Sequence, residues 1–203
     1  MPGDYIAEVY GTMVAAYWHE FQVLTKRPSR RQALMKDEAF REAVMRAAAR
    51  HVNSLRGEDR IRTTGGYSRS YVGTVNMAAW EEKHARNIWE GVTVENQRFA
   101  DERIPILLET PAAVRFLSCE PLLGPVDFKP AFQKVYSGGG VDSIMAGHTR
   151  HPRIDWVIVG GESGLAARST DIGHIESVVK QCLTAGVPVF VKQLGSRPVT
   201  WNF

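Results

Sequence analysis

The chain has 203 residues, of which 44% are apolar, so it can bury a core, and a single domain spanning 1–203 is the first expectation. Its formal net charge of +3 allows an anionic partner but does not require one. No segment is apolar over the length of a membrane span, and we expect no association with a membrane. The two cysteines, Cys119 and Cys182, lack C-x-x-C spacing, which predicts reduced, buried thiols in a cytoplasmic protein.

Apolar runs rich in Val, Ile and Phe alternate along the chain with stretches of helical spacing. The runs, which predict buried strands, cover 21–28, 87–96, 114–121, 154–164 and 187–193. The predicted helices cover 4–17 (with Asp4 as its cap), 29–55, 97–110 (broken near Pro105) and 172–185 (ended by Gly186). This alternation of β and α predicts an α/β fold with a parallel sheet.

Two stretches lack periodicity and are predicted to be long loops, near residues 56–75 and 134–152. Basic residues cluster at 26–31, 46–62 and 148–153. Such clusters are typical either of solvated surfaces or of contact with nucleic acid, and both interpretations stay open. The histidines show no spacing typical of metal ligands, and no metal site is predicted.

Polar residues follow the apolar runs at the points where the predicted strands end. Because the loops at the carboxyl ends of parallel strands converge on one edge, these residues are expected to line a ligand site. Glu95 with Asn96, and Glu120 before a proline, would bring two carboxylates to neighbouring strand ends. A carboxylate there can accept a hydrogen bond from a ribose hydroxyl or an amino group, or exchange protons. The alternative is a structural ion pair with Lys26, Arg27 or a lysine of the last strand.

The segment Val159–Gly164 ends the fourth run with closely spaced glycines. Gly160 and Gly161 would let backbone N–H groups approach an anion or an adenine, with Glu162 and Ser163 beside them. The spacing is neither G-x-G-x-x-G nor a Walker loop, and a tight βα turn with a serine helix cap explains it equally well.

The last run ends on Lys192 and Gln193, which could hold a carboxylate or a phosphate. The alternative for Lys192 is an ion pair with Glu162.

Six segments, taken in order, resemble a known family. They are 21–28, 91–97, 100–105, 115–125, 154–164 and 186–193. The family is the phage-protein family named after gene products thirty-seven and sixty-eight, which is of unknown function and is related to radical S-adenosylmethionine (SAM) enzymes. The resemblance spans nearly the whole chain, apart from about 52–86 and 132–152.

The resemblance implies a partial (β/α) barrel of about five parallel strands in the order of the sequence. It also implies that Glu95, Asn96, Glu120 and residues 160–163 lie on the side of SAM, with S-adenosylmethionine as the candidate cofactor. Lys26, Arg27, Lys192 and Gln193 would then face an anionic substrate, of which nucleic acid is one candidate. Full-length members carry a three-cysteine loop that this chain lacks, so an iron–sulfur cluster cannot form on this chain alone.

Three explanations stay open: half of a split enzyme, a truncated relative that became a binding protein, or a fragment of a longer product. In the second case the chain would be a non-enzymatic binding module that engages a host or phage protein through its exposed sheet face. Whether the chain is an enzyme is left open with them. A partial barrel exposes sheet edges, so we expect either a homo-oligomer or a partner protein that supplies the missing strands. A phage-encoded protein would act in the host cell cytoplasm.

Overall fold

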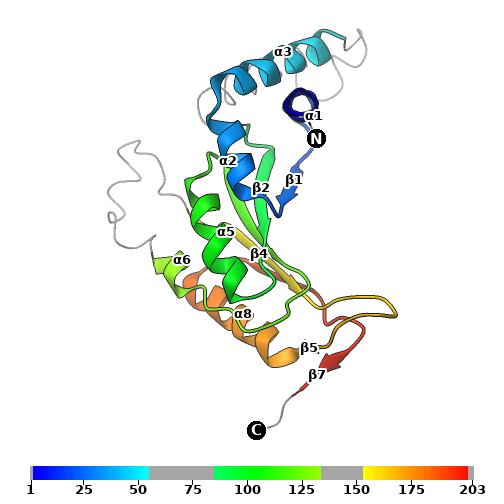
Figure 1. Cartoon of the computed structure of the whole chain (residues 1–203), viewed down its shortest axis with the longest axis vertical. Coiled ribbons are helices and arrows are strands. Elements are labelled where there is room, and N and C mark those ends of the chain that lie inside the picture. Colours follow the sequence, from blue (N-terminus) through cyan, green and yellow to red (C-terminus); the bar gives the residue numbers. More distant parts are fainter. Residues whose placement is uncertain (1, 55–84, 134–152, 201–203) are drawn as a thin grey trace. The chain divides into compact units, whose positions relative to one another are not determined.

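The computed structural model describes residues 2–54, 85–133 and 153–200 (Figure 1). Its centre is a five-stranded, all-parallel sheet in the order β1-β2-β3-β4-β6. The strands are β1 (Phe21–Thr25), β2 (Ile88–Thr93), β3 (Val114–Cys119), β4 (Trp156–Gly160) and β6 (Val189–Gln193). Each lies inside one of the five predicted runs, and their spatial order follows the sequence. The predicted α/β class, with the arrangement of a partial (β/α) barrel, is therefore confirmed.

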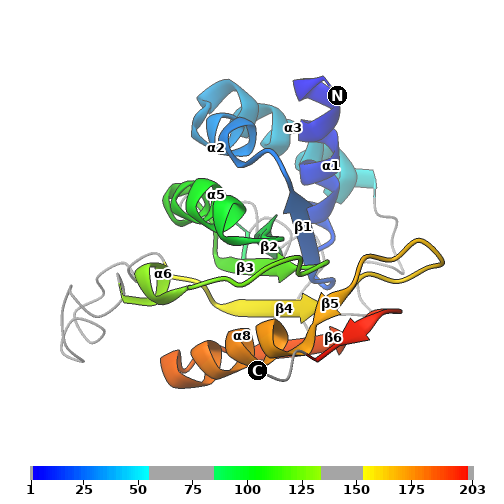
Figure 2. The same cartoon turned by 60° about the horizontal axis from the view of Figure 1, so that its bottom comes forward.

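Helices precede and separate the strands. They are α1 (Gly3–Ala15), α2 (Pro28–Lys36), α3 (Glu38–Ser54), α5 (Gln97–Glu109), α6 (Lys129–Gln133) and α8 (Ile172–Ala185). A second, two-stranded parallel sheet joins β5 (Thr170–Asp171) to β7 (Pro198–Val199), beyond the carboxyl end of β4 (Figure 2). Neither of these two-residue strands was predicted, because they are too short to show a period of two in the sequence.

The chain divides into two compact units. The first unit comprises 1–23, 29–90 and 110–114, and α1 packs against α3 at its centre. Gly11 allows this close approach, since a Cβ at that position would lie 2.3 Å from Cβ of Ala47. Tyr10 donates a hydrogen bond of 2.9 Å to the buried Glu90, which also pairs with Arg31. Burial raises the pKa of Tyr10 to about 12, so this hydroxyl stays protonated and donates at ordinary pH.

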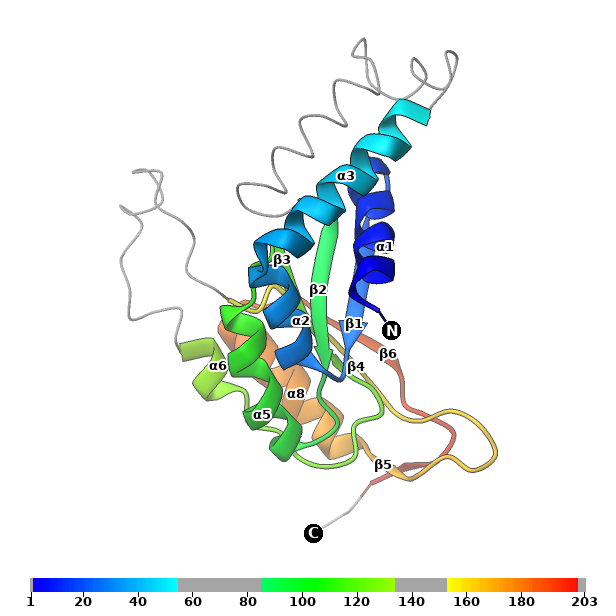
Figure 3. The same cartoon turned by 45° about the horizontal axis from the view of Figure 1, so that its top comes forward.

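The second unit comprises 24–28, 91–109 and 115–203, and it contains the polar strand ends. Strand β3 pairs in parallel with β4, and β4 pairs in parallel with β6. Helices α5, α6 and α8 gather beside these strands (Figure 3). Their apolar residues share one buried cluster with Leu117, Val157 and Val159 of the strands. Cys119 and Cys182 are buried in the same cluster as free thiols, as predicted.

Three helix predictions were wrong in detail. The single helix predicted over 29–55 is two helices, because the carboxylate of Asp37 accepts a hydrogen bond of 2.9 Å from Ala39 N and begins α3. Helix α5 continues through Pro105 instead of breaking there. Pro2, not Asp4, occupies the N-cap position of α1, and no side chain caps that helix.

The two predicted long loops, near 56–75 and 134–152, lie outside the described residues. The single domain over 1–203 stays a prediction. Within the described part of the chain, no helix has the length and apolar character needed to cross a membrane.

Candidate functional site at the carboxyl edge of the sheet

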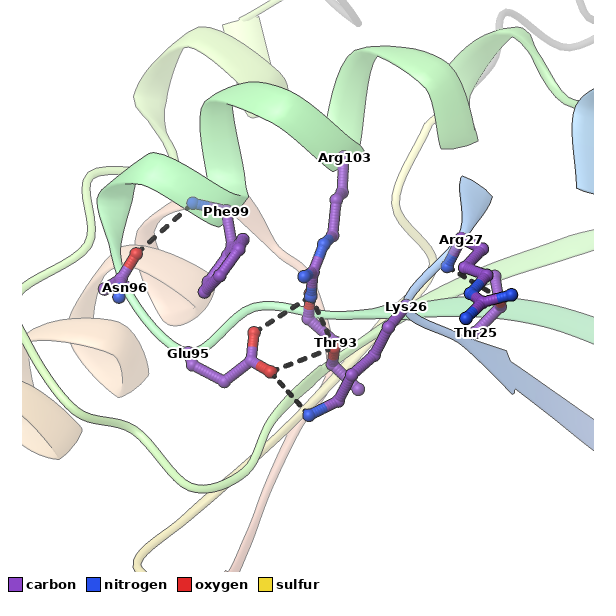
Figure 4. Close-up of polar contacts among 8 residues, drawn as sticks. All are labelled: Thr25, Lys26, Arg27, Thr93, Glu95, Asn96, Phe99 and Arg103. Atoms are coloured by element: carbon purple, nitrogen blue, oxygen red, sulfur yellow. Dashed lines mark hydrogen bonds and ion pairs between the residues drawn. The ribbon is translucent and has the colours of Figure 1, made fainter. Parts of the chain in front are cut away.

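The carboxylate of Glu95, two residues beyond β2, is the centre of a polar cluster (Figure 4). Lys26, which follows β1, places Nζ 2.9 Å from its Oε1. Arg103 of α5 donates a hydrogen bond of 3.0 Å to its Oε2, and the hydroxyl of Thr93 donates one of 3.3 Å to Oε1. Arg103 also donates to the Thr93 hydroxyl at 2.6 Å and to the Thr93 carbonyl at 2.9 Å. We call Lys26, Thr93, Glu95 and Arg103 the Glu95 cluster.

The Glu95 cluster keeps its carboxylate ionised. Burial acts to raise the pKa of Glu95, but the hydrogen bond from Lys26 and the charge of Arg103 outweigh it, and the net result is a pKa below the usual value. The guanidinium of Arg103 is held on its other side by the ring of Phe99, 3.9 Å from the ring centre.

Helix α5 places Arg103 because the helix begins directly after the end of β2. Asn96 accepts a hydrogen bond of 3.3 Å from Phe99 N, which is the role of a helix cap. Asn96 therefore fixes the start of α5, whatever else it contacts. Arg27, by contrast, does not join the Glu95 cluster; its backbone N–H donates to the Thr25 hydroxyl at 2.9 Å.

A second ion pair lies at the neighbouring strand ends. Lys192 of β6 places Nζ 3.4 Å from Oε1 of Glu120, which follows β3. The Glu120 side chain is 17% exposed and the Lys192 side chain 57% exposed. The structural ion pair that we kept open for Glu120 is thus present, whereas the alternative pairing of Lys192 with Glu162 was wrong.

The glycines after β4 make room for neighbouring parts of the chain itself. A Cβ at Gly160 would lie 2.9 Å from the carbonyl oxygen of Gln193, and a Cβ at Gly161 only 2.4 Å from that of Leu194. Gly161 N donates to the Gln193 carbonyl at 3.0 Å, and the hydroxyl of Ser163 donates to the Gln193 side chain at 2.7 Å. These glycines allow the ends of β4 and β6 to meet.

The alternative kept open for this segment, a tight βα turn with a serine helix cap, was wrong. Helix α8 is capped by Asp171, whose carboxylate accepts a hydrogen bond from Gly173 N, and Ser163 lies several residues before it. The segment between β4 and α8 is therefore a long connection that includes β5, not a tight turn.

Glu162 is paired by Arg168 of the same connection. Arg168 donates to Glu162 through its backbone N–H at 2.9 Å and through its guanidinium at 2.7 Å and 3.0 Å. These hydrogen bonds lower the pKa of Glu162 to about 2. Since the pair lies in the solvent-facing connection, we assign it the role of shaping that connection.

The segment after β3 connects the ends of the neighbouring strands through backbone hydrogen bonds. Leu122 N donates to the Gly160 carbonyl at 2.9 Å, and Leu123 N donates to the Glu95 carbonyl at 2.8 Å. The ends of β2, β3 and β4 are thereby held together by backbone hydrogen bonds. The predicted convergence of Glu95, Glu120 and Gly160 at one edge is confirmed.

A cavity of about 840 Å³ lies along α6 and α8. Its lining includes Val126, Phe132, Gln97 and Gln181. Both glutamines are hydrogen-bonded within the protein, to the backbone around Asp127. Asp127, Lys129 and Lys180 also line this cavity. At the carboxyl edge, by contrast, carboxylates and lysines from four strand ends meet in pairs, Lys26 with Glu95 and Lys192 with Glu120, so we take the edge as the candidate site. Among the residues that the structure describes, no group of three or more metal-ligating side chains occurs.

Sequence reasoning missed Arg103, Thr93 and Arg168. All three were hidden because their roles depend on which side chain folds back onto which carboxylate. For Arg103 the sequence holds a weak signal: the arginine lies four residues after Phe99, about one helical turn, in a helix that begins beside Glu95.

The family comparison gives a match to the model described as "Protein of unknown function (DUF5131)" over residues 1–201. The chain belongs to this family. Comparison with curated proteins and with solved structures found no significant match. The family description carries no function, so the carboxyl edge itself has to indicate what the chain does.

Proposed function

We propose that the chain binds a small ligand that carries an anionic group at the carboxyl edge of its sheet, with S-adenosylmethionine, which carries a carboxylate, as the candidate. In this proposal the chain is the cluster-free part of a radical-SAM-like phage enzyme that acts on an anionic substrate. The observation that carries it is the gathering of the Glu95 cluster and the Glu120–Lys192 pair at one parallel-sheet edge. Two exposed lysines there offer N–H donors to an anion.

The residues at the edge fit the polar groups of SAM. Lys26 and Lys192 can receive a carboxylate, while the oxygens of Glu120 and the Ser163 hydroxyl can accept from an amino group or a ribose hydroxyl. When bound with a cluster, SAM supplies a radical; this chain would contribute binding and orientation only. Both of its cysteines are buried in the core, and burial raises the pKa of each thiol, so neither is a cluster ligand.

Isothermal titration with SAM tests the proposal, first on the chain alone and then with candidate partner chains. We expect binding that is weakened in Lys26→Met and Lys192→Met, with Lys129→Met, a lysine away from the edge, as the control. No binding of SAM in either setting would refute the SAM assignment. Nucleic acid is tested in the same way, with a short single-stranded oligonucleotide as the second titrant.

An alternative function is a non-enzymatic binding module, favoured by the exposed edge at β6. Phe190, Val191 and Leu194 are 51%, 41% and 42% exposed, and Leu183 of α8 is 70% exposed beside them. An edge strand with apolar side chains and unpaired backbone groups tends to pair with another chain, either a second copy or a host or phage protein.

Sedimentation of the purified chain and a pull-down from host lysate test the binding module. Self-association or capture of one stoichiometric protein, lost in Phe190→Ser but kept in the Leu165→Ser control, supports it. A monomer that captures nothing and binds SAM decides for the enzyme part.

A further inference from the structure

The two cations that contact Glu95 differ sharply in exposure. The side chain of Arg103 is 7% exposed, as is that of Glu95, whereas that of Lys26 is 64% exposed. Each cation takes a different carboxylate oxygen, Arg103 at Oε2 and Lys26 at Oε1. The cluster therefore has an inner ion pair and an outer lysine attached to it (Figure 4).

The inner pair already supplies the counter-charge that a buried carboxylate needs. Removing one partner of such a pair is strongly destabilising, because the remaining charge stays buried without compensation. Arg103 alone balances the negative charge of Glu95. The positive charge of Lys26 is therefore in excess, and the cluster has a net charge of +1 on its exposed side. The Glu120–Lys192 pair differs, since one cation there meets one carboxylate.

We propose that Arg103 and Glu95 are positioning residues that hold Lys26 as the anion-receiving group of the site. Glu95 accepts one N–H bond of the ammonium and so fixes its direction; the other N–H bonds take a single oxyanion, a carboxylate or phosphate group of the ligand. This inference rests on the proposed function, because it assigns the part of the edge that binds the ligand's anionic group.

A double substitution separates positioning from charge. Glu95→Gln with Arg103→Met removes one negative and one positive charge, so the net charge of the cluster stays the same while the carboxylate that holds Lys26 is lost. Replacing both members of a buried pair together is also tolerated better than breaking it. Glu42→Gln with Arg46→Met is the matched control, since it removes one negative and one positive charge from an exposed ion pair of α3, a helix that contributes no residue to the carboxyl edge.

The assay is a titration of the full chain with inorganic phosphate and, separately, with sodium acetate, followed through the Lys26 Nζ resonance by NMR. We expect Lys26→Met to abolish binding and the Glu95/Arg103 double variant to weaken it about tenfold or more, as for the loss of one charge-assisted hydrogen bond. We expect the control double variant to stay within about threefold of wild type. Phosphate binding tighter than acetate binding assigns the site to a phosphate group, and the reverse order assigns it to a carboxylate.

A measurement on the unmodified protein keeps the inference testable if the double variant does not fold. The Lys26 Nζ resonance is expected to shift as Glu95 titrates, at a pH below the value of about 4.3 for an ordinary glutamate. No such shift, or anion binding that is equal in wild type and a folded double variant, overturns the inference while the proposed function stands. No binding of either anion to wild type overturns the inference, and only the SAM titration then decides the proposed function.

Discussion

Gly161→Ala should destabilise the fold because the position has no room for a methyl group. An added Cβ would lie 2.4 Å from the carbonyl oxygen of Leu194 and 2.6 Å from the Thr170 hydroxyl. The Leu194 carbonyl cannot turn aside easily, since hydrogen bonds from Gly161 N to Gln193 O and from Ser196 N to Glu162 O hold the two segments together. Relief requires the ends of β4 and β6 to separate. Overpacking of this kind costs about 1–3 kcal/mol.

Urea denaturation followed by circular dichroism measures this cost. With an m value of about 2 kcal/mol per molar urea, we expect the midpoint of Gly161→Ala to fall by roughly 0.5–1.5 M. Gly124→Ala is the control, because its nearest neighbour to an added Cβ is 3.7 Å away, and its stability should change by less than about 0.5 kcal/mol. Equal midpoints for the two variants would refute the packing role that we assign to Gly161.

Three further outcomes are expected. Because burial raises the pKa of Cys182 to about 12 and raises that of Cys119 as well, neither thiol should react with a thiol reagent at pH 8 until urea unfolds the chain; fast labelling of native protein would contradict this. The folded-state pKa of Glu95 is lowered, so its contribution to the unfolding free energy is complete above the unfolded value of about 4.3 and is lost as the pH falls through the folded value. Acid should therefore destabilise wild type more than the Glu95→Gln/Arg103→Met variant, and parallel losses from pH 6 to pH 3 would count against the lowered pKa. Leu117→Ala, at a position with 0% exposure in β3, should lower the free energy of unfolding by about 2–5 kcal/mol in the same urea assay. A loss below about 1 kcal/mol would contradict this and would mean that the neighbouring side chains close the space left by the leucine.

The strands could be predicted because their signal is local. A run such as Trp156–Gly160 carries no charged residue, as is typical of strands in a parallel sheet, and the glycines at its end mark where it stops. The end of α8 could be predicted equally well. Gly186 adopts φ 65° there, a conformation that favours glycine, so the glycine in the sequence marks the end of the helix. The division between α2 and α3 at Asp37 could not be predicted from the sequence, because the apolar residues on both sides keep helical spacing. The hydrogen bond by which Asp37 caps α3 marks the division in the structure.

At the candidate site, the polar residues that reach the carboxyl edge could be predicted from the amino-acid sequence alone. Parallel strands end on the same side, so Lys26, Glu95, Glu120 and Lys192 had to converge once the strands were recognised. How their charges pair depends on the three-dimensional packing of the elements. Arg103 reaches Glu95 because α5 turns back over the end of β2, and pairings of this kind depend on distances of a few ångströms between side chains of different elements. Coulomb and hydrogen-bond energies fall off over those distances, so they depend on the exact positions of the side chains. The burial of apolar residues that stabilises the strands depends instead on a pattern of apolar residues that can be recognised in the sequence.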